Sequence, residues 1–228
     1  MAQVKISVLP EATSIVSSDV LPIVESAVTK KVKAEKILMV KSLTDVRWKS
    51  IRISPEAIKL GGVNDPNFAV FKKDLPDTST GVFLYWFDKD AEEELFFSFE
   101  APLQYKEGTD INFEVYWVPK VNGGVGATVC WGLEHVHANE GSDFGVTTID
   151  CIDTALPSED LIADRHYRTE IVVCSGVGVK VGHIHICRLF RDATGAGGTD
   201  DYDDDAGLLG IGIRYQADAL GASTKDAK

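Results

Sequence analysis

The sequence predicts an all-β protein, a jelly-roll or β-sandwich of about ten strands with an extended N-terminal arm. Three observations support this prediction. Short runs alternate apolar and polar side chains, as strands with one buried face do. Clusters of Gly, Pro, Asp and Asn separate these runs, as turns do. Finally, no long stretch has the helical spacing of apolar residues that a packed amphipathic helix needs.

The clearest alternation runs from residue 94 to residue 119. Successive side chains of a strand point to opposite faces, so Leu95, Phe97 and Phe99 share one face. After the turn residues 106–110, Phe113 and Trp117 lie on the apolar face of a second strand. Two half-buried strands are marginal alone, so we expect further strands or a second sheet to cover them.

The same criteria place the other strands and divide the chain into an arm, residues 1–45, and a β-sandwich body, residues 46–228. The body's remaining strands are expected at 48–53, 68–72, 81–87, 127–137, 144–152, 167–174, 177–181, 183–190 and 208–216, with a helical turn at 161–163. In the arm, residues 20–24 and 28–32 are expected to pair as a short hairpin, followed by a helical turn at 34–38. The arm has too few apolar residues for a core of its own, so it would gain order by packing on something else.

Charge is unevenly distributed along the chain. The formal net charge is −12, which argues against a nucleic-acid partner because phosphates would be repelled. Residues 1–52 hold nine Lys or Arg against five Asp or Glu, a net +4, so the remainder carries −16. A mildly basic arm on an acidic body suits docking to an acidic surface, although such a charge distribution also arises by chance.

Neither a membrane nor a secretory pathway is predicted. The sequence has no apolar run of about 18 residues and no secretory signal at its start. The four cysteines lie far apart in apolar or β-like surroundings, which favours buried free thiols and assembly in a reducing compartment.

Three pieces of the arm resemble the N-terminal virion-attachment segment of many bacteriophage tail fibres and tailspikes. They are Ile6-Ser7-x-Leu9-Pro10-x-Ala12-Thr13, Asp19-x-Leu21-Pro22-Ile23-Val24 and Thr29-Lys30-Lys31-Val32. In that family the segment docks the protein onto the particle, and receptor-binding or enzymatic domains follow it. The resemblance therefore implies a virion-anchoring role for Ile6, Leu9, Pro10, Leu21, Pro22, Ile23, Thr29, Lys30, Lys31 and Val32.

The body resembles a β-rich family of phage virion proteins. The resemblance is carried by residues 106–111, 116–119, 131–134, 187–192 and the closing run 205–221. Members of that family often have His-x-His-Trp where this chain has Glu114-Val115-Tyr116-Trp117. A histidine-dependent role at that point is therefore not expected here.

Two pairs of histidines are the strongest candidates for metal chemistry. His135 and His137, and likewise His183 and His185, have the spacing of two that puts both imidazoles on one face of a strand. With Glu140, the first pair resembles a loosened cupin motif, and such N and O ligands suit Zn or Fe. The spacing and the flanking glycines depart from the cupin pattern, so ordinary half-buried histidines are the favoured interpretation, and we assign no metal or cofactor.

The acidic run Asp200–Asp205 is a weaker candidate. An EF-hand loop starting at Asp201 requires Gly and Glu where this chain has Ala206 and Gly212. A bent acidic loop can still gather a cation, but a solvated charge run is favoured.

No catalytic motif is recognised, and we name no catalytic residue. The glycine-rich segments lack the P-loop lysine and the dinucleotide fingerprint, and there is no Gly-x-Ser-x-Gly elbow. Tyr85, Trp86, Tyr116 and Trp131 are candidates for stacking on sugars or filling a subunit interface, although core burial is the default for most of them.

The leading hypothesis is a non-enzymatic structural protein of a tailed-phage virion, made in the host bacterial cytoplasm. It would bind other virion proteins through its arm as a tail-fibre or tailspike adaptor, form a homo-oligomer, with a trimer favoured, and contribute to binding a host surface glycan. Capsid decoration is the first alternative, and a cupin-like metalloenzyme is the second.

Overall fold

The computed structural model describes residues 20–25, 28–33, 47–74, 79–155 and 160–218. The chain divides into two units, Met1–Asp45 and Val46–Lys228. In the first unit, β1 (Val20–Glu25) and β2 (Val28–Lys33) pair as an antiparallel hairpin. The predicted pairing of 20–24 with 28–32 is therefore confirmed, whereas the helical turn expected at 34–38 lies outside the described residues.

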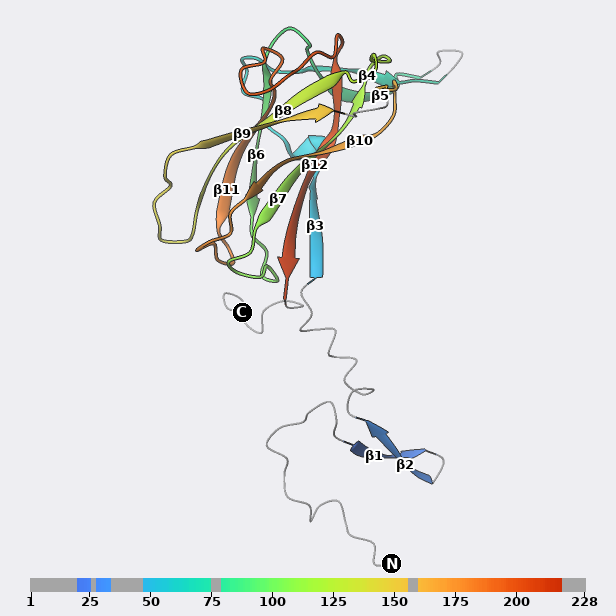
Figure 1. Cartoon of the computed structure of the whole chain (residues 1–228), viewed down its shortest axis with the longest axis vertical. Helices are drawn as coiled ribbons and strands as arrows, with labels where there is room; N and C mark the ends of the chain where they lie inside the picture. The colour runs from blue at the N-terminus through green and yellow to red at the C-terminus, as the bar shows by residue number, and fades with distance from the viewer. Residues whose placement is uncertain (1–19, 26–27, 34–46, 75–78, 156–159, 219–228) are drawn as a thin grey trace, which may run out of the picture. The chain divides into compact units, whose positions relative to one another are not determined.

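In its described residues, the body contains ten strands in two antiparallel sheets (Figure 1). The larger sheet has the order β10 (Tyr167–Cys174), β7 (Ile111–Pro119), β12 (Ala206–Ala217), β5 (Val82–Phe87) and β4 (Asn67–Lys72), and β3 (Arg47–Ile53) also pairs with β12. The smaller sheet has the order β6 (Glu93–Glu100), β11 (Ile184–Arg191), β8 (Thr128–Ala138) and β9 (Thr148–Ala155). The prediction of an all-β sandwich of about ten strands is confirmed.

Helical structure is nearly absent from the part of the chain that is described. A short 3₁₀ turn at Pro55–Ala57 ends β3, as the Ser54-Pro55 step predicts. Among the described residues, no helix is long and apolar enough to cross a membrane.

The two most strongly alternating strands lie in different sheets and face each other across the core. β6 pairs with β11, whereas β7 pairs with β10 and β12. The ring centroid of Phe113 on β7 lies 6.4 Å from that of Phe97 on β6. Farther along β7, Trp117 lies 6.2 Å from Trp131 of β8, and both tryptophans are fully buried. The inward rows of β6 and β7 thus form opposite walls of one core.

Three of the expected local elements differ from the structure. Residues 177–181 form a turn, because Val179 N donates to Gly176 O and Gly178 has a positive φ of 79°. The strand expected at 144–152 begins only at Thr148, because Thr148 is the first residue of this segment that pairs with β8. The helical turn expected at 161–163 is an irregular segment that buries Leu161 in the core.

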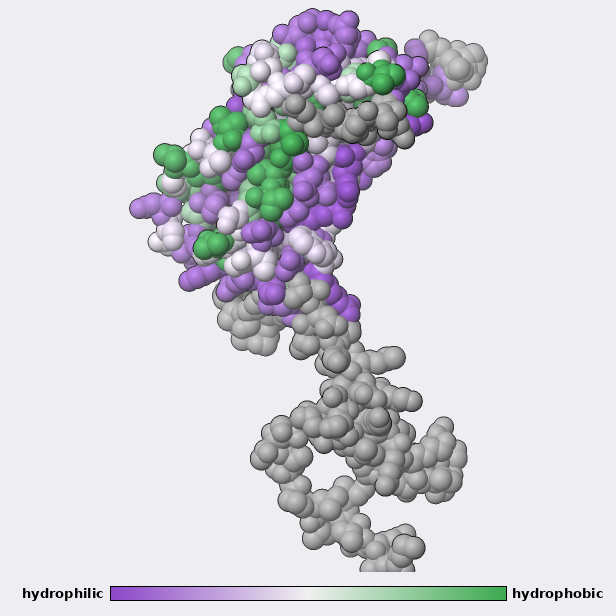
Figure 2. All heavy atoms as spheres, in the orientation of Figure 1, coloured by the Kyte–Doolittle hydropathy of each residue, from purple (hydrophilic) through white to green (hydrophobic). Residues whose placement is uncertain are grey.

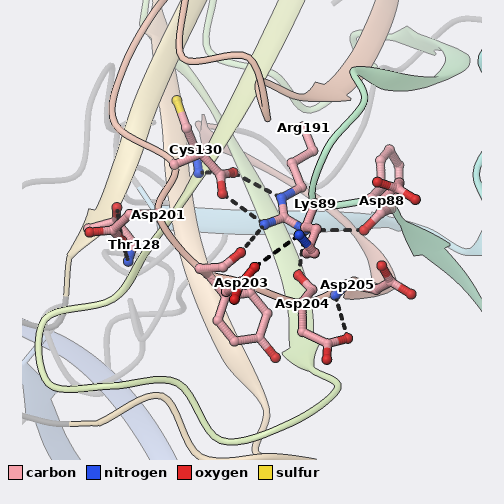
Figure 3. A network of polar contacts seen from close by, with 12 residues as sticks. Asp88, Lys89, Thr128, Cys130, Arg191, Asp201, Asp203, Asp204 and Asp205 are labelled. Atoms are coloured by element: carbon pink, nitrogen blue, oxygen red, sulfur yellow. Dashed lines mark hydrogen bonds and ion pairs between the residues drawn. The ribbon is translucent and has the colours of Figure 1, made fainter.

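One end of the sandwich is closed by a buried arginine. The Arg191 side chain is 0% exposed and forms a bidentate ion pair with Asp200, at 2.7 Å from Nη2 and 2.9 Å from Nε. Its guanidinium also donates to the carbonyl oxygens of Phe87, Tyr202 and Asp204 (Figure 3). A buried guanidinium is tolerated when its donors are paired in this way.

The acidic run is only partly solvated, because Asp200 is buried whereas Asp201 and Asp203 are exposed. Asp200 is the anionic partner of Arg191, and Asp201 accepts hydrogen bonds from the backbone and hydroxyl of Thr128. Asp203 forms an ion pair with Lys89 (Figure 3), and Asp205 forms one with Lys120. The expectation of a solvated charge run was wrong for Asp200, whose side chain is 1% exposed, because the partner nine residues earlier is brought to it only by folding.

The cysteines agree with the expectation of buried thiols in three of four cases. Cys130, Cys174 and Cys187 are buried, whereas Cys151 is partly exposed. Cys151, Cys174 and Cys187 carry free thiols.

We predict that Arg191→Leu destabilises the body by about 3–5 kcal/mol, because it leaves the Asp200 carboxylate buried without its cation. The free energy of unfolding from urea denaturation measures the effect. The double variant Arg191→Leu/Asp200→Leu should recover much of the loss, since it removes both buried charges.

Lys120→Met is the matched control, because Lys120 pairs with Asp205 at 2.6 Å on an exposed surface. It should cost less than about 1 kcal/mol. Equal changes in the free energy of unfolding for Arg191→Leu and Lys120→Met would show that the buried ion pair stabilises the body no more than the exposed one.

Candidate functional site

The other end of the sandwich carries a pocket of about 510 Å³. The loop that follows β8 forms one side of it with Glu140 and Phe144, and Ile184 at the start of β11 forms part of its floor. The pocket is lined by Glu100, Leu103, Ala138, Asn139, Glu140, Gly141, Ser142, Phe144, Val181, Gly182 and Ile184. The carboxylates of Glu100 and Glu140 are solvent exposed, and Phe144 is 47% exposed. A ligand in the pocket would therefore meet hydrogen-bond acceptors and an apolar ring together.

One asparagine holds the two loops that flank this pocket. Asn139 Nδ2 donates to Gly178 O at 2.9 Å, and Lys180 N donates to Asn139 Oδ1 at 3.0 Å. The loop after β8 is thereby tied to the loop before β11. The rim is consequently preformed, as ligand pockets usually are.

Directly inside this end, four of the five histidines of the chain gather on one face of the smaller sheet. His135 and His137 continue the inward row of β8, which begins with Val129, Trp131 and Leu133. On β11, His185 is the direct register partner of His137. His183 precedes His185 by two residues and lies in the turn before β11.

The imidazoles are close enough to share a ligand. One ring nitrogen from each of His135, His137 and His185 lies within 4.8 Å of the other two. The ring centroid of His185 is 4.8 Å from that of His137 and 4.6 Å from that of His183. His135, His183 and His185 are buried, whereas His137 is exposed. The cluster is thus open to solvent on the His137 side.

Burial disfavours the protonated form of three of these imidazoles, those of His137, His183 and His185. It lowers the pKa of His185 to about 2, with further lowering by the neighbouring charges of His183, His137 and His135. Burial also lowers the pKa values of His137 and His183. A neutral imidazole is the form that binds a metal ion.

Hydrogen bonds orient two of the four rings. His135 Nε2 lies 3.3 Å from Asp150 Oδ2, and a carboxylate can only accept, so this nitrogen carries the proton. His183 Nδ1 likewise donates to Lys180 O at 2.9 Å. Within the described residues, three further ring nitrogens have no hydrogen-bond partner. They are His183 Nε2 and both ring nitrogens of His185.

The cupin-like sequence motif and the clustered side chains share two residues and differ in the third. His135 and His137 lie together, as their spacing predicts. Glu140, the third member of the cupin-like motif, is exposed and lines the pocket, so that motif is not assembled. His185 takes its place, and the signal was present in the His183-Ile184-His185 repeat. What the sequence lacked was the pairing of β8 with β11.

The predicted virion-anchoring residues are divided by the limits of the described structure. Ile6, Leu9 and Pro10 lie outside the described residues. The others lie on the two strands of the hairpin, where Leu21, Pro22, Ile23 and Val24 are the register partners of Val32, Lys31, Lys30 and Thr29. The second and third pieces of the resemblance are therefore the two halves of one hairpin.

The position where the phage family often has His-x-His-Trp has a different chemistry here. Glu114 is buried on the outer side of the larger sheet, with Arg214 at 2.7 Å and Arg168 at 3.4 Å. The Tyr116 hydroxyl donates to Glu114 at 3.0 Å. Of the aromatics considered for sugar stacking, Trp86 and Trp131 are buried, whereas Tyr85 and Tyr116 are partly exposed.

Comparisons with known proteins identify no family for this chain. No family model and no curated protein matches it. Among solved structures, the carbohydrate-binding module TmCBM61, in complex with β-1,4-galactotriose, matches at 15% identity over 74% of this chain and 86% of that chain, with a TM-score of 0.27. The mannan-recognising module TmCBM27 matches at 13% identity over 74% and 98%, with a TM-score of 0.32.

A third match is a virus structure. Infectious bursal disease virus, Gx strain, matches at 11% identity over 91% of this chain and 38% of that chain, with a TM-score of 0.35. All three TM-scores lie below 0.5, so none of these likenesses establishes a relationship or a function for this chain.

Proposed function

We propose that this chain is a non-enzymatic structural protein of a tailed-phage virion, anchored by residues 1–45 and presenting the β-sandwich body. The observation that supports this most is the hairpin of β1 and β2, which coincides with two of the three pieces that resemble phage attachment segments. Its location would be the virion, assembled in the host bacterial cytoplasm, with other virion proteins as partners.

The composition of the body core supports a separable anchor. The buried apolar cluster of the described residues is drawn entirely from residues 58 to 217. Trp117, Trp131 and Phe113 at its centre are fully buried by other body residues. The body therefore has its own core.

Self-association, with a trimer favoured, belongs to the same proposal. The outer face of the smaller sheet exposes Ile149, Ile184 and Ile186 at 55%, 42% and 50%. Figure 2 shows apolar residues gathered in patches on a body surface that is otherwise largely hydrophilic. Such patches supply contact area between copies or with another virion protein.

We predict that a chain lacking residues 1–45 folds but is lost from particles by at least about tenfold, which corresponds to about 1.4 kcal/mol of docking free energy. The measurement compares full-length and truncated protein in particles purified by gradient sedimentation, with circular dichroism to confirm the fold of the truncated chain. Normal incorporation of the folded, truncated chain would refute anchoring.

A charge-reversal pair tests the hairpin itself. Lys30→Glu/Lys31→Glu should reduce incorporation, since these residues belong to the resembling segment on β2. The matched control is Lys72→Glu/Lys73→Glu, another Lys-Lys pair that lies in the body. Imaging of the particles then separates a tail position from capsid decoration.

We also propose that the pocket beside Phe144 binds a neutral glycan of the host surface. Its exposed carboxylates, Glu100 and Glu140, can accept hydrogen bonds from sugar hydroxyls, and the half-exposed Phe144 ring offers an apolar face for stacking. Residues 53–228 carry a net charge of −16, which disfavours anionic polysaccharides.

We expect Phe144→Ala and Glu140→Ala each to weaken glycan binding by about tenfold, the effect of losing about 1.4 kcal/mol. Calorimetry with neutral host-wall oligosaccharides measures it. Phe68→Ala is the control, because Phe68 is also an exposed aromatic at 57% but lies on β4, outside the pocket. An equal loss in Phe68→Ala, or no binding by the unaltered protein, would exclude this site.

A further inference from the structure

We infer that His135, His137 and His185 form a binding site for a divalent metal ion of the zinc class, with His183 as the fourth ligand. The inference is independent of the virion role and of the glycan pocket. It rests on the convergence of four imidazoles from β8 and the start of β11, and on buried ring nitrogens for which no group of the described residues forms a hydrogen bond.

The first step is the free-energy cost of burying the His185 ring nitrogens without a metal. A neutral imidazole always has one donor and one acceptor nitrogen. His185 is 1% exposed, yet neither nitrogen has a hydrogen-bond partner among the described residues. Leaving a buried polar group unsatisfied costs free energy, so such groups in native proteins call for an explanation. A metal ion accepts the lone pair of one nitrogen and removes part of that cost.

The second step is the geometry. Zn–N bonds of about 2.0–2.1 Å place tetrahedral ligand nitrogens about 3.4 Å apart. The three nitrogens here lie within 4.8 Å of one another, so a contraction of up to about 1.4 Å would bring these three to tetrahedral spacing. His137 is exposed and can make much of this adjustment by rotating its side chain.

The third step is the preparation of the other rings. Asp150 accepts from His135 Nε2, which leaves the lone pair on Nδ1, 3.9 Å from Cys174 Sγ. Lys180 O accepts from His183 Nδ1, which leaves the buried Nε2 available. Metal-binding histidines are commonly oriented by a carboxylate or a backbone carbonyl in this way.

The donor set indicates the class of metal. Four imidazoles suit Zn²⁺ and related late divalent ions, whereas Mg²⁺ and Ca²⁺ prefer oxygen ligands. Nearby Cys174 is buried, with its Sγ 3.5 Å from His135 Nε2. The bound ion would link β8 to the start of β11 at this end of the sandwich, which is a structural role.

The test uses tag-free full-length protein, stripped with a chelator and titrated with ZnCl₂. We expect one Zn²⁺ per chain, a higher melting temperature with Zn²⁺, and a Co²⁺ form with the visible absorption of tetrahedral coordination. His185→Ala and His137→Ala should each weaken Zn²⁺ binding by more than about 100-fold, and Asp150→Ala by about 10–100-fold.

His166→Ala is the matched control. His166 is the fifth histidine, exposed and on the segment before β10, and its removal should leave Zn²⁺ affinity unchanged. If His185→Ala fails to fold, the exposed His137 decides the question, because its removal does not disturb the core. Absence of stoichiometric Zn²⁺ binding by the unaltered protein, or wild-type affinity in folded His137→Ala, would overturn the inference.

Discussion

The fold depends on burying the inward row of β7 between two sheets. Phe113, Val115 and Trp117 alternate with outward residues, and all three are fully buried. One sheet cannot cover such a row, so the smaller sheet must lie across it with its own inward row. Replacing one large buried aromatic by alanine typically costs about 3–5 kcal/mol, a large share of the stability of a domain. Pairing, twist and loop positions are arranged around this requirement.

The facing row on the smaller sheet changes its chemistry along its length. On β8 it is apolar through Val129, Trp131 and Leu133 and then continues as His135 and His137. On β11 the inward row reads His185, Cys187, Leu189 and Arg191 from one end to the other. Apolar packing holds the centre, and each end carries a buried polar side chain. The two ends are therefore where the fold makes its specific polar arrangements.

The alternating patterns were sufficient to predict the fold class and most strands. Periodicity is a local property, so β6 and β7 could be recognised from residues 94–119 alone. That these neighbours in sequence lie in different sheets could not be predicted, because strand pairing is decided by contacts distant in sequence. The wrong strand prediction at 177–181 has a local cause. The alternating valines there are typical of a strand, but Gly178 adopts a positive φ and the segment forms a turn.

The candidate site was predictable only in pieces for the same reason. Each His-x-His pair could be read from its spacing, but the register that sets His137 opposite His185 appears only in the folded sheet. Glu140 looked like the natural third ligand because it is near in sequence, yet its side chain belongs to a pocket rim. Asp200 looked solvated because its partner Arg191 is recognised as buried only after folding.

The two ends of β11 bear on whether this fold tolerates unsatisfied polar groups. Arg191 is buried at one end, and an aspartate and three backbone carbonyls accept from its guanidinium. His185 is equally buried at the other end, and no group of the described chain contacts its ring nitrogens by a hydrogen bond. The sandwich therefore provides partners where a buried charge requires them. Within the described residues Trp131 Nε1 is also buried without a partner, but at His185 three more imidazoles lie beside the unsatisfied nitrogens, which is the arrangement that a ligand from outside the chain would complete.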